Sequence, residues 1–219
     1  MCQLLTKLVH YPDRLDALST LLGLALSPTR GLSLLRSAKM SLRLDGRLTI
    51  APGGRLYAGA LSNRLQLDTA ARGTLNVYPT GHLTIDGHVR ISRTCKIYIN
   101  GHLSIAHGTY IQANTMILAN STVTVGANCA ISWNCQLLDD DLHDSPLKTD
   151  SGRPKPITVG ANVWIGANVI ILRGVTIGAN STIGAGSIVT KSFPPNSFIG
   201  GNPARPIAVV ESPKSPPGV

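Results

Sequence analysis

The fold is decided by the stretch VGANVWIGANVIILRGVTIGANSTIGAGSIV, which covers residues 159–189. A β-branched residue returns at every sixth position, and a second mostly small or aliphatic residue follows each of them four places later. The first set comprises Val159, Ile165, Ile171, Ile177, Ile183 and Val189. A period of six matches neither the helical turn of about 3.6 residues nor the plain alternation of a hairpin strand. It predicts short strands joined by tight corners.

Three such hexads make one triangular coil, and successive coils stack through backbone hydrogen bonds with their aliphatic side chains inside. The composition agrees with this prediction, because hydrophobic residues make up 43% of the chain and aromatic residues only 4%. A narrow interior accommodates β-branched side chains and leaves little room for rings. Glycine and asparagine supply backbone angles for the corners.

The repeat continues upstream with a longer period of twenty residues. Residues 82–91, 102–111 and 122–131 align without gaps, and a looser copy begins at Gly46. The sequence thus predicts an all-β solenoid over residues 42–200. In it, His82 and His102 are one coil apart, about 5 Å by the strand spacing. Cys95 and Cys135 are two coils apart, which is too far for a disulfide.

The two ends of the chain differ from the repeat. In residues 1–41 leucines recur at helical spacing, and Pro28 breaks the pattern. We expect one or two short amphipathic helices there that cap the first coil, with peripheral membrane association through residues 1–40 as the alternative. Residues 201–219 are expected to be a C-terminal segment that ends in a disordered tail over 211–219.

Charge and composition limit the partners. A formal charge of +9 would attract nucleic acid, anionic membrane or a phosphorylated ligand. The basic residues are scattered singly and few aromatic residues are present to stack bases, so no nucleic-acid partner is expected. The longest apolar stretch, residues 21–26, is too short to span a bilayer, and no signal peptide stands out. We expect a cytoplasmic protein, and the cysteines lack zinc-ligand spacing.

The solenoid pattern is interrupted once, over residues 139–156, which are predicted to loop out from a corner. Five of the eleven acidic residues gather within this segment, around His143. A histidine that titrates near neutral pH and is oriented by a carboxylate suits general-base catalysis. Judged from these residues alone, a solvated loop histidine is the competing interpretation.

Residues 159–191, followed by GNPAR at 201–205, resemble the signature of the hexapeptide-repeat acyltransferases. The similarity is to the branch of sugar and polysaccharide O-acetyltransferases that includes the maltose and galactoside enzymes. It implies a left-handed parallel β-helix and a homotrimer with active sites between neighbouring subunits. It also implies direct transfer from acetyl-CoA to a sugar or glycan hydroxyl, without a metal, in polysaccharide or cell-surface glycan biosynthesis. The acceptor and the length of the acyl group stay open.

The resemblance assigns roles to individual residues. His143, before the return PITVG at 156–160, corresponds to the general base, and Asp141 is the candidate that orients it, with Asp139 and Asp140 as rivals. Residues expected at the acyl donor are Trp164, Gly166, Ala167, Gly184, Ala185, Lys191 and Arg205. Candidates for contacting the acceptor are Asn114, Asn134 and Asp139; corner asparagines are the alternative interpretation of the first two.

Three other functions are considered for the same fold. A zinc enzyme like the gamma-type carbonic anhydrases would use His102 and His107, which are spaced suggestively, with His88 nearby. A non-catalytic β-helix scaffold would tolerate the loss of His143. Serine acetyltransferases are a closer rival, but no match to their large helical N-terminal domain is found.

Overall fold

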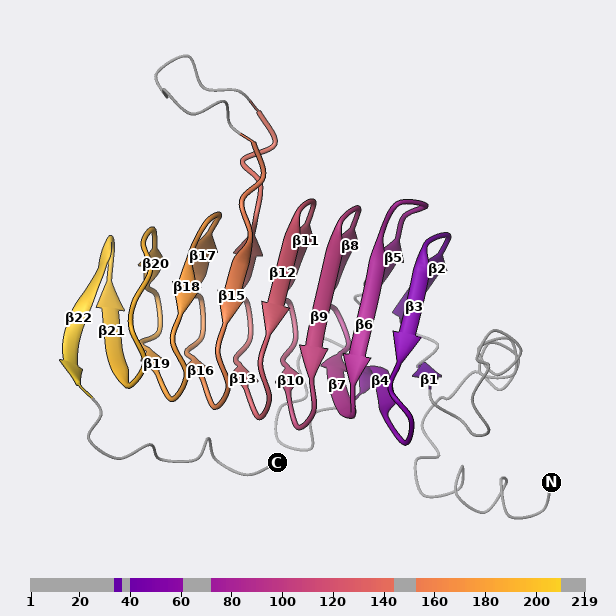
Figure 1. The fold of residues 1–219 in the computed structure, drawn as a ribbon, viewed down its shortest axis with the longest axis horizontal. Helices are drawn as coiled ribbons and strands as arrows, with labels where there is room; N and C mark the ends of the chain where they lie inside the picture. Colours follow the sequence, from indigo (N-terminus) through magenta and orange to yellow (C-terminus); the bar gives the residue numbers. More distant parts are fainter. Residues whose placement is uncertain (1–33, 37–39, 61–71, 144–152, 210–219) are drawn as a thin grey trace.

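The computed structural model describes residues 34–36, 40–60, 72–143 and 153–209. All regular secondary structure in these ranges is β-strand, from β1 (Leu34–Arg36) to β22 (Ala204–Val209). The strands lie side by side as the coils of an elongated solenoid (Figure 1). Within the described ranges, no helix has the length and apolar character needed to cross a membrane.

Three sheets form the sides of the solenoid, and each takes every third strand. The first face contains β1 (Leu34–Arg36), β4 (Arg55–Ala60), β7 (His88–Ser92), β10 (Tyr110–Ile111), β13 (Ala130–Ile131), β16 (Trp164–Ile165), β19 (Thr182–Ile183), β21 (Ser197–Gly201) and β22 (Ala204–Val209). The second face contains β2 (Met40–Leu44), β5 (Gly73–Val77), β8 (Lys96–Ile99), β11 (Met116–Ala119), β14 (Gln136–Leu138), β17 (Ile170–Leu172) and β20 (Ile188–Val189). The third face contains β3 (Arg47–Ile50), β6 (His82–Asp86), β9 (His102–Ala106), β12 (Thr122–Val125), β15 (Ile157–Val159) and β18 (Thr176–Ile177).

The strand register confirms both periods of the sequence. His82 pairs with His102, and His102 with Thr122, so these coils take twenty residues each. Thr158 pairs with Thr176, which gives eighteen residues for the later coils. All neighbouring strands are parallel except β21 and β22, which form an antiparallel hairpin at the C-terminal end of the first face. The predicted all-β solenoid is therefore confirmed.

The core is a set of stacked aliphatic ladders. On the third face, Ile85, Ile105, Val125, Val159 and Ile177 succeed one another in register, and each is at most 1% exposed. β-Branched side chains suit this arrangement because their restricted χ1 angles match the strand conformation. Among the described residues, Phe193 is the one aromatic side chain in the buried core. The scarcity of rings in the sequence therefore has the expected physical cause.

The corners are built mainly by asparagine. Seven asparagines have φ between 56° and 61°, the left-handed region that asparagine enters more easily than most residues. Their side chains also form ladders from coil to coil: the Nδ2 of Asn162 donates to the Oδ1 of Asn180 at 3.0 Å, and that of Asn180 to Asn196 at 3.2 Å. Asn114 and Asn134 belong to this set, with φ of 60° and 59°. The structure thus supports the corner interpretation for both.

The solenoid strands begin ahead of residue 42, because Leu34–Arg36 pairs in parallel with β4 and Met40–Leu44 with β5. This pairing depends on contacts with residues further along the chain, which helical spacing of leucines does not reveal. The expected N-terminal helices and the membrane alternative fall mainly on residues 1–33, outside the described ranges. The expected tail over 211–219 lies outside them too.

Candidate functional site

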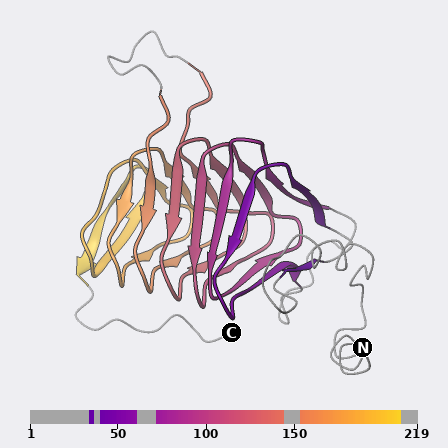
Figure 2. The ribbon, with the colours of Figure 1, turned by 45° about the vertical axis from the view of Figure 1, so that its right-hand side comes forward.

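The loop that interrupts the repeat leaves the second face after β14 and returns to the third face at β15. Its described ends project from the body of the solenoid (Figure 2). Its two limbs are joined at the base, where the backbone N–H of Lys155 donates to the carbonyl of Asp139 at 2.8 Å. Gly174 of the next coil donates to the carbonyl of Lys155 at 3.2 Å. The described ends of the loop, residues 139–143 and 153–156, are therefore anchored to the rigid coils.

Asp139 is a structural residue of this base. It is fully buried, and its two carboxylate oxygens accept hydrogen bonds from the backbone N–H groups of Asn120 and Ser121 at 2.8 and 2.7 Å. Burial raises the pKa of its carboxyl group, and these hydrogen bonds oppose the shift. A carboxylate with no exposed surface cannot contact an acceptor, so the structure places Asp139 in the corner and not in the proposed substrate contact.

Asp140 shapes the backbone that carries the histidine. Its Oδ2 accepts from the Nδ2 of Asn120 at 2.7 Å, and its Oδ1 accepts from the backbone N–H of Leu142 at 2.9 Å. Leu142 has a φ of 60°, which is rare for a leucine because its Cβ crowds the backbone there. The short turn held by Asp140 compensates this strain and fixes the direction in which His143 leaves.

Asp141 forms the ion pair of the site. The Nε of Arg173 donates to the Oδ2 of Asp141 at 2.7 Å, and the two side chains are only 9% and 21% exposed. The Nη1 of Arg173 also donates to the carbonyl of Arg153 at 3.3 Å. Arg173 thus holds both limbs of the loop. This residue was not predicted from the sequence, although it stands where the other hexads of 159–189 have alanine.

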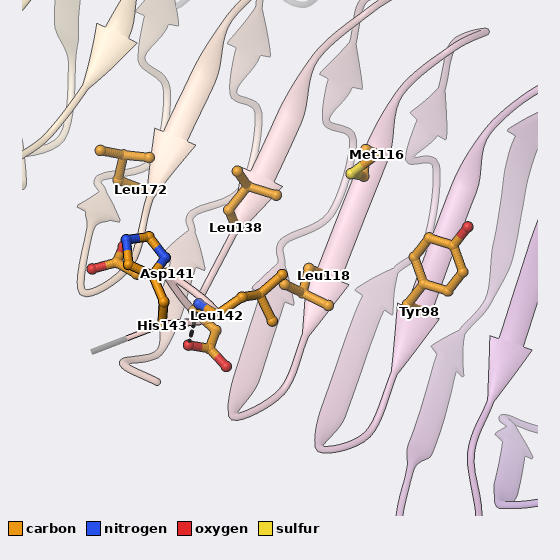
Figure 3. A pocket seen from close by; sticks show the side chains of 9 residues that line it. Tyr98, Met116, Leu118, Leu138, Asp141, Leu142, His143 and Leu172 are labelled. Carbon is orange, nitrogen blue, oxygen red and sulfur yellow. Dashed lines mark hydrogen bonds between the residues drawn. The ribbon is translucent and has the colours of Figure 1, made fainter. Parts of the chain in front are cut away.

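His143 and Asp141 line the same pocket, which has a volume of about 570 Å³. Its floor is the outer surface of the second face, where four side chains follow one another in register: Tyr98, Leu118, Leu138 and Leu172. Met116 and Leu142 complete the apolar lining. Figure 3 shows the imidazole and the carboxylate together at one end of this row. The pocket therefore combines a flat apolar floor with a histidine that is exposed to an incoming molecule.

The pocket floor was not predicted from the sequence. The aliphatic residues of the repeat were all explained by the buried core, so none was assigned to the outer surface. Leu137 faces the core and Leu138 faces the pocket, so two adjacent leucines serve opposite sides of one strand. Aliphatic residues at successive outward positions of one face are the signal that would have identified the floor.

The residues expected at the acyl donor lie elsewhere on the chain. Trp164 stands on the first face, 44% exposed, with its indole Nε1 donating to the Oγ of Ser132 at 3.4 Å. Lys191 and Arg205 are exposed, and Lys191 lies over the ring of Phe193. None of the seven expected donor residues is among those that line the His143 pocket within one chain.

Two of these residues, Gly166 and Gly184, differ in how much space the fold leaves for a side chain. At Gly166 a Cβ would lie 2.7 Å from the backbone nitrogen of Ala185, so the stacking of coils excludes a side chain. At Gly184 the nearest atom to a Cβ would be the carbonyl oxygen of Ile199 at 3.5 Å, which is ordinary contact. The stacking of coils therefore requires glycine at position 166, whereas it would tolerate a small side chain at position 184.

Of the histidines considered for zinc, His102 is engaged with its neighbours on the third face. His82 and His102 stack with ring centroids 4.9 Å apart, as the repeat predicted, and His102 shares a hydrogen bond with the hydroxyl of Thr84 at 2.9 Å. Burial first, then the neighbouring His102 and Arg47, lower the pKa of His82. In the part of the chain that the structure describes, no three side chains of His, Cys, Asp or Glu are grouped to hold a metal ion.

The described cysteines are core residues. Cys95, Cys129 and Cys135 are free and fully buried. Burial raises the pKa of the Cys95 thiol to about 12 and that of the Cys135 thiol to about 11, so neither is a reactive thiolate. The prediction that Cys95 and Cys135 are members of the stack is confirmed.

Comparison with known proteins gives consistent results. The family described as bacterial transferase hexapeptide (six repeats) matches residues 156–191. A putative acetyltransferase of Dictyostelium discoideum is 39% identical over 121 residues, which are 54% of this chain and 64% of that protein. Galactoside O-acetyltransferase of Escherichia coli is 44% identical over 108 residues, 48% of this chain and 53% of the enzyme. The chain thus spans less than two thirds of these relatives.

A solved structure agrees with the fold. It is a mutant of AntD, an N-acyltransferase from Bacillus cereus, in complex with dTDP-4-amino-4,6-dideoxyglucose and coenzyme A. The likeness covers 91% of this chain and 92% of that chain, with 19% identity and a TM-score of 0.59, and it bears on the fold alone. Hexapeptide-repeat neighbours of this kind are left-handed β-helices, in agreement with the expected handedness. Residues 156–191 thus match the hexapeptide-repeat family, and the chain is similar to hexapeptide-repeat acetyltransferases in sequence and in fold.

Proposed function

We propose that this chain is an acetyl-CoA-dependent O-acetyltransferase that modifies a hydroxyl group of a sugar or glycan. The observation that carries the proposal is the position of His143, which lies beside the ion-paired Asp141 at one end of a pocket with an apolar floor. The similarity to galactoside O-acetyltransferase supports the acceptor class. Polysaccharide or cell-surface glycan biosynthesis is the process to which such a product would belong.

The proposed chemistry is direct acyl transfer. Bound acetyl-CoA supplies an acetyl group activated as a thioester. The imidazole of His143 accepts the proton of the acceptor hydroxyl as its oxygen bonds to the acetyl carbon, and the carbon–sulfur bond then breaks. His143 returns the proton to the departing sulfur, so that the imidazole is neutral again after each cycle. A backbone N–H group stabilises the negative charge on the acetyl oxygen.

Asp141 is proposed to orient His143. Both residues line the pocket, two positions apart, with the strained Leu142 between them. Arg173 fixes the carboxylate of Asp141, so its direction is set before an acceptor arrives. Preorganised charges of this kind need no rearrangement during the reaction.

The acyl donor is proposed to bind along the first face and its neighbouring corner. The residues that would hold it are Trp164, Gly166, Ala167, Gly184, Ala185, Lys191 and Arg205. The lack of a side chain at Gly184 suits close approach of a ligand to the backbone, and the exposed cations of Lys191 and Arg205 suit phosphates.

We further propose a homotrimer in the cytoplasm, with each site completed by a neighbouring subunit. Two features support shared sites: the donor residues do not line the His143 pocket of their own chain, and the pocket floor is an apolar outer surface. Peripheral association with a membrane through residues 1–40 is the alternative to a purely cytoplasmic protein.

The decisive assay mixes the full-length protein with acetyl-CoA and a panel of sugar and nucleotide-sugar acceptors, and measures the free thiol released. We expect one acceptor class to be turned over, and His143→Ala to reduce turnover by several orders of magnitude while acetyl-CoA binding and oligomeric mass are unchanged. Near-normal turnover by this variant would refute the proposal. Stoichiometric zinc that is lost on His102→Ala would favour a zinc enzyme instead.

A further inference from the structure

Aromatic side chains form a row on the outside of the first face. The strand register places seven residues in one line across the coils: Tyr57, Arg90, Tyr110, Ala130, Trp164, Thr182 and Phe198. We call this line the aromatic row. It holds four of the chain's nine aromatic residues, counted as two Trp, five Tyr and two Phe. Its members point outward, because their chain neighbours Leu56, Val89, Ile111, Ile131, Ile165, Ile183 and Ile199 are at most 1% exposed.

The rings recur on every second strand. Tyr57 is on β4, Tyr110 on β10, Trp164 on β16 and Phe198 on β21, and one strand of the first face separates each pair. Twice the strand spacing is about 9.6 Å, so the rings are evenly placed along the axis of the solenoid. Figure 1 shows these strands in order along one side of the molecule.

A small residue next to Trp164 in the aromatic row allows its ring to lie close to the surface of the sheet. The indole of Trp164 reaches back to Ser132, beside the preceding strand β13. Ala130, its register partner on β13, is only 1% exposed although it faces outward. A small residue here lets the indole rest against the neighbouring coil and keeps part of it, 44%, open to solvent. The row is therefore a shallow platform and does not protrude as separate rings.

The N-terminal half of the row is positively charged. Arg90 lies between Tyr57 and Tyr110 and is exposed. Arg55 and His88, which are register partners on the same side of their strands, are exposed as well. None of the strands β4, β7, β10, β13 and β16 contains an acidic residue. The surface thus suits an anionic ligand with flat apolar faces.

We propose that the aromatic row binds an extended acidic glycan, which lies along the solenoid axis with every second sugar ring stacked on Tyr57, Tyr110 and Trp164. The proposal rests on the proposed function, whose acceptor class it narrows from a sugar to an anionic polymer. The ring spacing matches the length of two sugar units in an extended chain. Arg90 pairs with an acidic group of the sugar between two stacked rings.

The alternative polymer, single-stranded nucleic acid, fits this geometry less well. Nucleic-acid platforms stack successive bases on aromatic side chains. In the row, each pair of rings is separated by an arginine, an alanine or a threonine, so successive bases would not each find a ring. The row also continues toward the residues proposed for the acyl donor, since Trp164 belongs to both sets. A glycan on the N-terminal side of Trp164 would therefore meet the donor at this residue.

The test is direct binding to the full-length protein without acetyl-CoA, measured by isothermal titration calorimetry. The probes are acidic oligogalacturonides of increasing length, neutral cello-oligosaccharides of the same lengths, and oligothymidylate. We expect the oligogalacturonides to bind, with affinity that rises until the oligomer spans the distance from Tyr57 to Trp164, about 19 Å for four strand spacings. Neutral oligomers and oligothymidylate are expected to bind at least tenfold more weakly.

Variants of the row separate stacking from charge. Tyr110→Ala and Tyr57→Ala are each expected to weaken oligogalacturonide binding roughly five- to tenfold. Arg90→Gln, at an exposed position that the fold does not need, is expected to reduce the preference for acidic over neutral oligomers. Tyr78→Ala is the matched control, because Tyr78 is a tyrosine outside the row, and it should bind as the wild type does.

Several results would overturn the inference. Tighter binding of oligothymidylate would assign the row to nucleic acid, and a change in oligomeric mass in Tyr110→Ala would assign it to a subunit contact. Acetylation of a small sugar by the wild type without any binding of oligogalacturonides would refute the inference and leave the proposed function intact. Binding of oligogalacturonides that depends on Tyr110, without thiol release from any acceptor, would refute the proposed function alone.

Discussion

Arg173 and Asp141 come from different coils and meet at the base of the loop, with 2.7 Å between the Nε of the guanidinium and the Oδ2 of the carboxylate. Arg173 belongs to the repeat that resumes after the loop, whereas Asp141 belongs to its outgoing limb. Because Arg173 also binds the carbonyl of Arg153 on the returning limb, a single side chain closes the loop. The ion pair therefore connects the regular repeat to the position of His143.

Loss of this arginine should affect both stability and turnover. Arg173→Met removes the guanidinium that pairs with the half-buried carboxylate of Asp141, which we expect to lower the free energy of unfolding by about 1.5–3 kcal/mol. Turnover should fall at least tenfold, with little change in the KM for acetyl-CoA, because the residues proposed to bind the acyl donor do not line the pocket of Asp141. Arg153→Met is the control, since Arg173 contacts the backbone of Arg153. Chemical denaturation and thiol release check both values, and equal effects of the two variants would argue against a positioning role.

Gly166 and Gly184 form a matched pair of glycines one coil apart. Gly166→Ala forces a Cβ to within 2.7 Å of backbone, and overpacking of this kind costs about 1–3 kcal/mol. Gly184→Ala adds a methyl group at ordinary contact distance, so stability should change by less than about 0.5 kcal/mol. The KM for acetyl-CoA should nevertheless rise in Gly184→Ala if the donor contacts the backbone at this position. Thermal denaturation together with the KM of each variant distinguishes the two roles, and an unchanged KM would remove Gly184 from the donor site.

The asparagine corners should be sensitive to backbone strain as well as to hydrogen bonding. Asn180 has a φ of 60° and bonds to both Asn162 and Asn196. Asn180→Ala should destabilise the protein by at least about 1–2 kcal/mol, because alanine resists this conformation. Asn180→Gly loses the same side-chain bonds but relieves the strain, so it should be the milder change. If denaturant titrations show that both variants are equally unstable, the loss of stability comes mainly from the side-chain hydrogen bonds and not from the backbone angle.

The stacked histidines should make stability depend on pH. The pKa of His82 is lowered in the folded state, so the unfolded chain binds protons more readily below about pH 6.5. This contribution to stability is present above that pH and is lost as the pH falls through it. The melting temperature should therefore decrease on acidification, and His82→Gln should decrease less steeply. A parallel decline in both proteins would show that other groups control acid stability.

The sequence predicts the coils well because their cause is local. A β-branched residue at every sixth position and an asparagine or glycine at most corners satisfy geometric requirements that recur in each hexad, so the strands and their register can be predicted from spacing alone. His82 stacks on His102 because a twenty-residue period leaves no other arrangement. The position of the loop is evident for the same reason, since it is where the period stops.

The roles of the acidic residues in the loop could not be separated from sequence. Asp139, Asp140 and Asp141 are consecutive, yet one is buried in a corner, one holds a turn and one pairs with Arg173. These roles depend on how the backbone leaves the strand and on which coil lies beneath each side chain. The repeat pattern contains no information about either, because the loop is outside the repeat.

The sequence alone determined the solenoid. With a six-residue period, stacked coils bury the aliphatic side chains and at the same time pair the backbone groups of neighbouring coils. What only the tertiary structure decided is the outer surface. The pocket floor and the aromatic row are formed by residues whose nearest partners lie 16 to 34 positions apart in the chain. Their side chains become neighbours only when the coils stack, and outward positions are not under the packing constraint that makes the inward ladder evident in the sequence.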